Sequence, residues 1–280
     1  MTITAPEPQR ERLDPDEQPT ALVKLWICPN DDLPPALAGV LATHWLDEQE
    51  RGNANRFLFE RDRRQYLVAH TLVRRALALE VGVAEADLVF WRSSRGRPFL
   101  RPLPGGPPRG SAHLDFNLSH ASGYNLLGIV RGHRVGVDVE RLDRDPQTID
   151  TIVRTFTPQE QSWVAGAAPG HPRTRRALRL WTLKEAYSKA RGLGLGLPFD
   201  EFSFTLAEDR VLDFRPPADD LGRQWRFLEL EPVPEVLVAV AVPDDADRSP
   251  TLQLHYGFPW GREEARRFVL PEPVGGPPGY

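Results

Sequence analysis

The sequence predicts an α+β protein built from two similar halves, with the functional site in the cleft between them. The chain of 280 residues shows the same order of apolar patterns twice: a strand, two helices and three further strands. In each pass the second helix is long enough to cover one face of a small sheet. A cleft between two such units is the usual place for a ligand.

The first half is expected to span residues 21–132. Its strands are short apolar runs, and its helices carry apolar residues at steps of three and four. These elements are a strand at 21–28, helices at 35–50 and 61–80, a strand at 88–91, and two strands at 113–118 and 124–130.

The second half is expected to span residues 133–260. It has a strand at 134–140, helices at 158–165 and 174–191, and strands at 201–206, 225–230 and 236–242. Thr157, Pro158 and Glu160 predict the start of the shorter helix, because together they form a capping box with proline at the first helical position. The core face of the longer helix is formed by Ala177, Leu180, Leu183, Tyr187 and Ala190.

The two ends of the chain, residues 1–20 and 261–280, read as mobile tails because they are rich in charged residues, Pro and Gly. No apolar run approaches the roughly 18 residues of a membrane span, and no signal-peptide core is present. With one cysteine, Cys28, no internal disulfide can form. We expect a cytoplasmic protein with no membrane partner. The net charge of −4 argues against nucleic-acid binding.

Lysine is scarce and concentrated in one helix. Only three of the 35 Lys and Arg residues are lysines, and Lys184 and Lys189 flank Glu185. A chain that uses arginine nearly everywhere is expected to keep lysine where a compact ammonium cannot be replaced by the planar guanidinium of arginine. Glu185 and Lys189 also have the spacing of an ordinary surface ion pair, and spacing alone favours that interpretation.

Asp138 and Glu140 lie two residues apart in the strand at 134–140, so they project from the same face. An isolated pair of this kind is usually only exposed. Here valines occupy the other face, and like charges repel unless a cation lies between them. Hard oxygen ligands suit Mg²⁺ or Mn²⁺, with substrate phosphates completing the coordination. Together with Glu185 and Lys189, the pair suggests a divalent cation that holds phosphates.

Other polar side chains could meet those phosphates. Ser119 and His120 interrupt an apolar strand pair. They form either an ordinary polar turn or hydrogen-bond donors to phosphate oxygens. Arg97 lies in a Gly-Arg-Pro turn and is either solvated or a phosphate contact. Arg63 and Arg64 open the first long helix, where the helix dipole favours anions, so they are a weak sign of a bound anion.

Five motifs in this order carry a resemblance to a known family. They are Gly-Arg-Pro at 96–98, Phe-Asn-Leu-Ser-His at 116–120, Gly-Val-Asp-Val-Glu at 136–140, Phe-Thr-Pro-Gln-Glu at 156–160, and Trp-Thr-Leu-Lys-Glu-Ala-Tyr-Ser-Lys at 181–189. Over residues 21–242 the chain resembles the 4′-phosphopantetheinyl transferases of the surfactin-synthetase-activating type.

The resemblance implies a monomer whose halves are related by pseudo-two-fold symmetry and bind coenzyme A and Mg²⁺ in the cleft. Such an enzyme transfers phosphopantetheine to a serine of an acyl or peptidyl carrier protein domain and releases adenosine 3′,5′-bisphosphate. The implied metal ligands are Asp138, Glu140 and Glu185. The implied catalytic residues are Glu185, Lys189 and Asp138. The implied coenzyme A contacts are Arg97, Ser119, His120, Arg63, Arg64 and Lys189.

The chain departs from the family where more N-terminal lysines would contact coenzyme A, because Glu50 and Asn53 occupy that region. The resemblance therefore leaves open which arginine contacts the 3′-phosphate: Arg56, Arg61, Arg63 or Arg64. Two alternatives stay open. One is a module that binds coenzyme A or a nucleotide without transfer. The other is a protein that docks acidic carrier partners through the arginine-rich run at 173–179. Neither alternative requires the three carboxylates.

Overall fold

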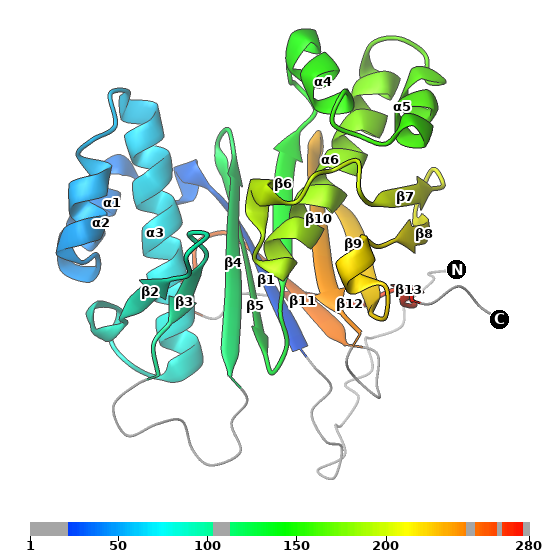
Figure 1. Ribbon diagram of the computed structural model, residues 1–280. Helices are drawn as coiled ribbons and strands as arrows, with labels where there is room; N and C mark the ends of the chain where they lie inside the picture. Colours follow the sequence, from blue (N-terminus) through cyan, green and yellow to red (C-terminus); the bar gives the residue numbers. More distant parts are fainter. Residues whose placement is uncertain (1–21, 103–112, 245–249, 262–264, 277–280) are drawn as a thin grey trace, which may run out of the picture.

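The computed structural model describes residues 22–102, 113–244, 250–261 and 265–276. Two sheets form the centre of the molecule, and each is covered by one long helix (Figure 1). The α+β fold of two sheet-containing halves predicted from the sequence is confirmed. The predicted tail at 1–20 lies outside the described residues. Among the described helices, none is long and apolar enough to cross a membrane.

The first sheet is mostly built from the first half of the chain. In spatial order its strands are β12 (Ala265–Val269), β11 (Thr251–Tyr256), β1 (Leu22–Pro29), β5 (Tyr124–Arg131) and β4 (Leu114–Ala121). All neighbours are antiparallel except β1 and β11, which run parallel. The helices on this side are α1 (Pro35–Trp45), α2 (Glu48–Ala54) and α3 (Glu60–Val81), and α3 lies over β4 and β5.

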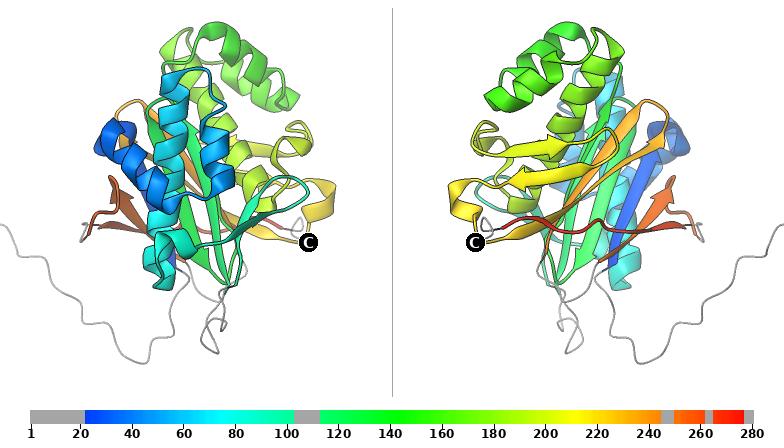
Figure 2. Two further views of the ribbon diagram at one scale, coloured as in Figure 1. Left: turned by 90° about the vertical axis from the view of Figure 1, so that its left-hand side faces the viewer. Right: turned by 90° about the vertical axis from the view of Figure 1, so that its right-hand side faces the viewer.

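The second sheet contains, in spatial order, β13 (Val274–Gly275), β9 (Gln224–Val233), β10 (Val236–Pro243) and β6 (Gly136–Arg141). Its helices are α4 (Pro146–Val153), α5 (Pro158–Ala165) and α6 (His171–Arg191), and α6 lies directly on β6 and β10. Two hairpins flank the sheets: β2 (Phe90–Arg92) with β3 (Pro98–Leu100), and β7 (Ser203–Leu206) with β8 (Val211–Arg215). Figure 2 shows the molecule from the side of α3 and from the side of β7 and β8.

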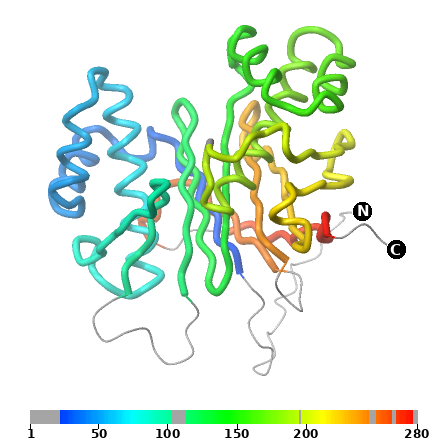
Figure 3. Tube along the Cα trace, in the orientation of Figure 1, coloured from blue at the N-terminus to red at the C-terminus, as the bar shows by residue number. Residues whose placement is uncertain are grey.

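The chain after residue 250 differs from what the sequence led us to expect. Residues 251–256 return to the first sheet, where β11 pairs with β1, although they were assigned to the second half (Figure 3). Two short strands, β12 and β13, lie within the stretch expected to be a tail. The reason is that β1 needs a partner on its outer edge. Leu252 and Leu254 give β11 the alternating apolar residues for that place.

Local signals explain two further differences. The helix expected at 35–50 is two helices, because Asp47 accepts a hydrogen bond from the Glu50 backbone and starts α2 with a capping box of its own. Helix α4 was not expected. Asp145 caps it, accepting from the backbone of Gln147 and Thr148, and Pro146 is its first residue, a start signal that the sequence does show.

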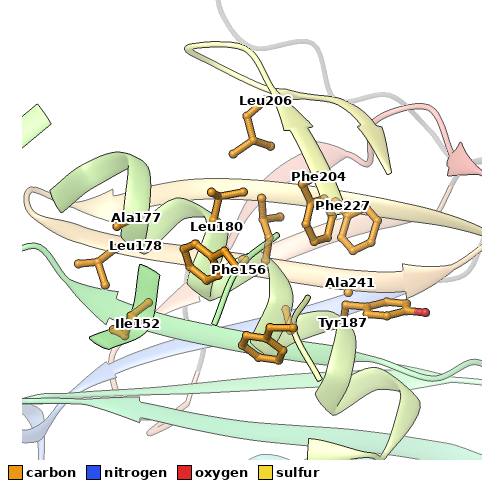
Figure 4. Packing of buried hydrophobic residues seen from close by; sticks show 14 of the residues in the cluster. Ile152, Phe156, Ala177, Leu178, Leu180, Tyr187, Phe204, Leu206, Phe227 and Ala241 are labelled. Carbon is orange, nitrogen blue, oxygen red and sulfur yellow. The ribbon is translucent and has the colours of Figure 1, made fainter. Parts of the chain in front are cut away.

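The three largest of the four apolar clusters among the described residues hold the layers together. One lies under α3. Another lies under α6; it includes Phe156, and in it Tyr187 and Phe204 both pack against Phe227 (Figure 4). The third lies between the two sheets and includes the valines of β6. Strand β6 is therefore buried on both faces. Its valines face the other sheet, and Gly136, Asp138 and Glu140 face α6.

The two sheets meet edge to edge at β4 and β6, which lie side by side without a backbone ladder. Side chains of β4 replace that ladder. Asp115 Oδ2 accepts from Val135 N at 3.0 Å, and Asn117 Oδ1 accepts from Val137 N at 2.8 Å. Because both partners advance by two residues, the strands run parallel. We call this junction the seam, and Ser119 is the next side chain along it.

Candidate active site

The site is built where α6 approaches β6 more closely than an ordinary side chain would allow. A Cβ atom on Gly136 would lie 1.9 Å from the carbonyl oxygen of Ala186 and 2.4 Å from the backbone nitrogen of Ala190. Glycine at this position therefore lets the helix rest on the strand backbone. The approach brings Glu185 and Lys189 of α6 close to Asp138, two residues beyond Gly136.

Lys189 joins the helix, the strand and the seam. Its Nζ atom donates to Asp138 Oδ1 at 2.5 Å and to Ser119 Oγ at 2.9 Å, and Ser119 Oγ donates to the same Asp138 oxygen at 2.7 Å. The Asp138 side chain is buried, with 6% of its surface exposed, and its Oδ2 atom has no hydrogen-bond partner among the described residues. One carboxylate oxygen is thus well satisfied while the other is left open.

Glu140 lies next to Asp138 on the same face and is held by two donors that the sequence analysis did not identify. Arg144 donates to Glu140 Oε2 from Nε at 2.8 Å and from Nη2 at 2.5 Å, and Trp181 Nε1 donates to Oε1 at 3.2 Å. Burial raises the pKa of Glu140, the charge of Asp138 raises it further, and Arg144 opposes both. The i, i+4 spacing of Glu140 and Arg144 could not identify the pair, because residue 144 lies beyond the strand.

Glu185 is only loosely paired with a cation. Its Oε2 atom is 4.0 Å from Lys189 Nζ, and 11% of its side chain is exposed. Burial raises the pKa of Glu185 to about 7; Lys189 lowers it, while Asp138 and Glu140 raise it. A carboxylate with a pKa near neutral pH is suited to accept a proton. Mutual repulsion among these three carboxylates is also what a bound cation would relieve.

The donor set fits a hard divalent cation. Asp138, Glu140 and Glu185 offer carboxylate oxygens, the ligands that Mg²⁺ and Mn²⁺ prefer, and the buried Asp138 Oδ2 is unpaired. In the conformation described, Lys189 lies against Asp138. In this conformation, and within the described residues, no group of three or more His, Cys, Asp or Glu side chains is arranged so that it could hold a metal ion. A cation here would need further ligands from its substrate or from water.

His120 and the start of α3 lie on the first-half side of the site. The His120 side chain is solvent-accessible, yet desolvation and then the charge of Lys189 lower its pKa, which favours the neutral ring. Gln65 of α3 donates to Asn125 Oδ1 at 2.6 Å, and Asn125 is paired with His120 across β4 and β5. This contact holds the first turns of α3 beside the end of β4.

The predicted arginine contacts are placed differently from one another. Arg63 is half-exposed and its nearest acidic partner is Glu60, at 3.4 Å. Arg64 donates to the Asn30 carbonyl oxygen at 2.9 Å and to Asp31 Oδ1 at 3.0 Å. Both lie in the first two turns of α3, and no described contact joins either of them to the carboxylates.

Arg97 is buried beneath the site rather than open to it. Its Nη2 atom donates to Asp115 Oδ2 at 2.6 Å, to the Val135 carbonyl oxygen at 2.9 Å and to the Phe116 carbonyl oxygen at 3.1 Å. Its Nη1 atom donates to the carbonyl oxygen of Lys189. One side chain therefore ties together both strands of the seam and the end of α6.

Two other predicted features prove to be structural. The Lys184 ammonium is fully buried and bound to Glu160 at 2.9 Å, so it is not part of the group formed by Asp138, Glu140, Glu185 and Lys189, which we call the Asp138 cluster. The arginine-rich run is paired within the chain, which weakens the interpretation as a basic docking patch. The four ion pairs are Arg173–Asp150, Arg175–Glu231, Arg176–Glu208 and Arg179–Glu229.

Family comparisons cover both halves of the chain. Residues 134–241 match the model of the 4′-phosphopantetheinyl transferase superfamily, and residues 35–129 match the model described as 4′-phosphopantetheinyl transferase, N-terminal. A phosphopantetheinyl transferase of Thraustochytrium sp. is 33% identical over 74% of this chain and 74% of its own length. The 4′-phosphopantetheinyl transferase HetI of Nostoc sp. is 31% identical over 85% of this chain and 92% of its own length.

A third relative, a 4′-phosphopantetheinyl transferase of Bacillus subtilis, is 30% identical over 72% of this chain and 85% of its own length. The two family models together cover most of both halves, and residues 134–241 include β6 and α6. The chain belongs to the 4′-phosphopantetheinyl transferase superfamily.

Proposed function

We propose that this phosphopantetheinyl transferase moves the 4′-phosphopantetheine group of coenzyme A onto a serine of an acyl or peptidyl carrier protein domain, with Mg²⁺ as its cofactor and Mn²⁺ as a possible substitute. The observation that carries the proposal is the meeting of acidic side chains from β6 and α6, with Lys189 bound to Asp138 at 2.5 Å. We further propose that the enzyme works as a monomer in the cytoplasm.

Asp138, Glu140 and Glu185 would hold the cation. When bound, Mg²⁺ supplies positive charge that offsets the negative charge of the coenzyme A diphosphate. Family membership and the unpaired, buried Asp138 Oδ2 support this assignment. Arg144 and Trp181 would orient Glu140, since both donate to its carboxylate.

The reaction forms a bond between the carrier serine oxygen and the phosphorus on the pantetheine side. It breaks the bond from that phosphorus to the bridging oxygen, and adenosine 3′,5′-bisphosphate leaves. We assign Glu185 to accept the serine proton, because its carboxylate lies beside Asp138 and is the most loosely paired of the three, with Lys189 Nζ 4.0 Å away. Lys189 would donate to the departing phosphate, whose negative charge increases as the bond breaks.

Ser119, His120, Arg63 and Arg64 remain our proposed contacts to the phosphates of coenzyme A. The Ser119 hydroxyl and the Lys189 ammonium already point to one spot at the end of the seam. A contact from Arg97 would require its guanidinium to leave Asp115 and three carbonyl oxygens. We therefore infer that Arg97 acts mainly through the position of Lys189.

Mass spectrometry of a purified apo carrier domain, incubated with the protein, coenzyme A and Mg²⁺, tests the proposal. The expected result is a mass increase of one phosphopantetheine on the carrier serine, which disappears with a chelator. Glu185→Gln should lower turnover about 10²-fold or more, as expected for loss of a general base. Glu208→Gln is the matched control, because the Glu208 side chain is 88% exposed and should leave turnover unchanged.

Different outcomes separate the rival functions. Coenzyme A binding without any mass increase on several carriers would favour a binding module. Carrier binding that weakens with salt, ignores Mg²⁺ and yields no product would favour a docking protein. A Glu185→Gln variant with normal turnover would remove Glu185 from the role of base while leaving the transfer reaction in place.

A further inference from the structure

Lys189 occupies the position of a counter-ion to the predicted metal ligands. Its ammonium lies 2.5 Å from Asp138 Oδ1 and 4.0 Å from Glu185 Oε2, and Ser119 holds it at 2.9 Å. The nearest other cation of the cluster, Arg144, is engaged with Glu140. In the described conformation, Lys189 is therefore the charge that balances Asp138 and Glu185.

A divalent cation and this ammonium would compete for the same carboxylate. Like charges repel, and repulsion is strong where water is largely excluded. The side chains of Lys189 and Asp138 are 23% and 6% exposed, so their ion pair is only partly screened. For Asp138 to become a metal ligand, Lys189 has to give up at least part of its contact with Oδ1.

The displaced ammonium needs another anion. A diphosphate bound at the same cation would supply phosphate oxygens within reach of the flexible lysine chain. Metal and diphosphate would then each make binding of the other more favourable, and the two effects must be equal by linkage. Arginine would serve less well, because its rigid fork is held by directed hydrogen bonds, whereas an ammonium is a compact charge with rotatable donors.

We propose that Lys189 is an internal counter-ion that weakens divalent-cation binding to the coenzyme A-free protein and so couples cation binding to diphosphate binding. The inference rests on the proposed function for the identity of the cation and the diphosphate. It assigns to Lys189 a role before the chemical step, in addition to its assistance to the leaving group.

The test measures Mn²⁺ affinity directly, by the electron paramagnetic resonance signal of free Mn²⁺, with no carrier protein present. Wild-type protein should bind Mn²⁺ at least tenfold more weakly without coenzyme A than with it. Lys189→Met should bind Mn²⁺ about tenfold or more tightly than wild type when coenzyme A is absent. The gain in affinity on adding coenzyme A should shrink by a similar factor in this variant.

Lys24→Met is the matched control, because Lys24 is also paired with a carboxylate, Glu80 at 2.5 Å, but on β1 of the other sheet. It loses the same charge and should leave Mn²⁺ affinity unchanged. Should Lys189→Met fail to fold, as judged by circular dichroism, Lys189→Gln makes the same comparison with a neutral side chain that carries a hydrogen-bond donor.

The counter-ion role alone would be overturned if Lys189→Met and Lys189→Gln bound Mn²⁺ with the affinity of wild type while the wild-type protein transferred phosphopantetheine normally. Equal tightening in Lys24→Met would overturn it as well, because the effect would then come from net charge. A wild-type protein that neither binds Mn²⁺ with coenzyme A nor modifies any carrier would instead overturn the proposed function, and the counter-ion role with it.

Discussion

The two halves contain the same arrangement of a buried cation on a long helix. Comparing them separates the structural framework, which both halves share, from the proposed catalytic residues, which only the second half has. In the first half, Arg74 of α3 is 1% exposed and donates to Glu50, the capping-box glutamate of α2, at 2.7 Å. Its Nη1 atom also donates to the carbonyl oxygens of Glu85 and Leu88, which follow the helix. One cation thus fastens the preceding helix and the following segment onto α3.

The second half repeats this arrangement with a lysine. Lys184 of α6 donates to Glu160, the capping-box glutamate of α5, and to the carbonyl oxygens of Phe199 and Phe202, each at 2.6 Å. Burial lowers the pKa of Lys184 to about 8, and Glu160 opposes that shift. Arg74 and Lys184 therefore occupy corresponding positions on the two long helices.

Aligning the helices on these residues shows that the chemistry is not duplicated. The residue after Arg74 is Arg75, where α6 has Glu185, and five residues after Arg74 comes Leu79, where α6 has Lys189. Arg75 is paired with Glu85 at 2.6 Å, and Leu79 is 49% exposed. The first half has the buried cation but no counterpart of Glu185 and Lys189, so the proposed reaction depends on where the second half places α6.

The largest expected effect comes from the contact that only the second half makes. Gly136→Ala would put a methyl group 1.9 Å from a backbone oxygen of α6, and neither helix nor strand can move without disturbing the packed layers on both sides. We expect the free energy of unfolding to fall by more than about 5 kcal/mol, at the extreme of single substitutions. Urea denaturation followed by circular dichroism measures it.

Gly128→Ala on β5 is the matched control. Its methyl group would meet Val137 Cγ1 at 2.6 Å, a side-chain atom that can shift. The loss should stay within the roughly 1–3 kcal/mol typical of overpacking. Similar losses for the two variants would contradict the view that the close approach of α6 to β6 distinguishes the second half.

The next effect compares the two buried cations. Lys184→Met leaves Glu160 without its cation at a position where its side chain is 2% exposed, and breaking such a pair typically costs about 3–5 kcal/mol. Arg74→Met should cost less, about 1–3 kcal/mol, because Glu50 is 13% exposed and keeps its bond to His70 at 2.9 Å. Thermal and urea unfolding of both variants give the comparison. A larger loss of unfolding free energy for Arg74→Met than for Lys184→Met would contradict the expectation that the buried cation of the second half contributes more to stability.

Local sequence patterns were enough to predict the direction in which the charged side chains of the site point. Alternating valines place Asp138 and Glu140 on one face of β6, and the helical period separates Glu185 and Lys189 from the core face of α6. Because each pattern fixes a direction, the two segments had only to be packed together for their charges to meet. The structure does bring Asp138, Glu185, Lys189 and Ser119 together.

Long-range pairing was not predictable from one sequence. Arg97 reads as an exposed residue of a turn, yet it is buried because its acceptors come from β4, β6 and α6. The sequence groups Lys184 with Glu185 because the two are adjacent, but adjacent helical residues point in different directions. The return of β11 to β1 likewise joins segments more than 200 residues apart, which no local pattern encodes.

The smallest effect is a pH dependence confined to the second half, measured in metal-free protein with a chelator present. Because the pKa of Glu185 is raised from 4.5 to about 7, its protonated form stabilises the fold below pH 4.5, and that contribution is lost as pH rises to 7. Glu185→Gln stays neutral throughout. Its unfolding free energy relative to wild type should therefore increase between pH 4.5 and 7, by on the order of 3 kcal/mol.

Urea titrations across this range measure the difference in unfolding free energy between variant and wild type. Arg75→Gln, at the corresponding position of α3, is the control and should show no such increase. A constant difference for Glu185→Gln would mean that the Asp138 cluster does not hold its carboxylate protonated.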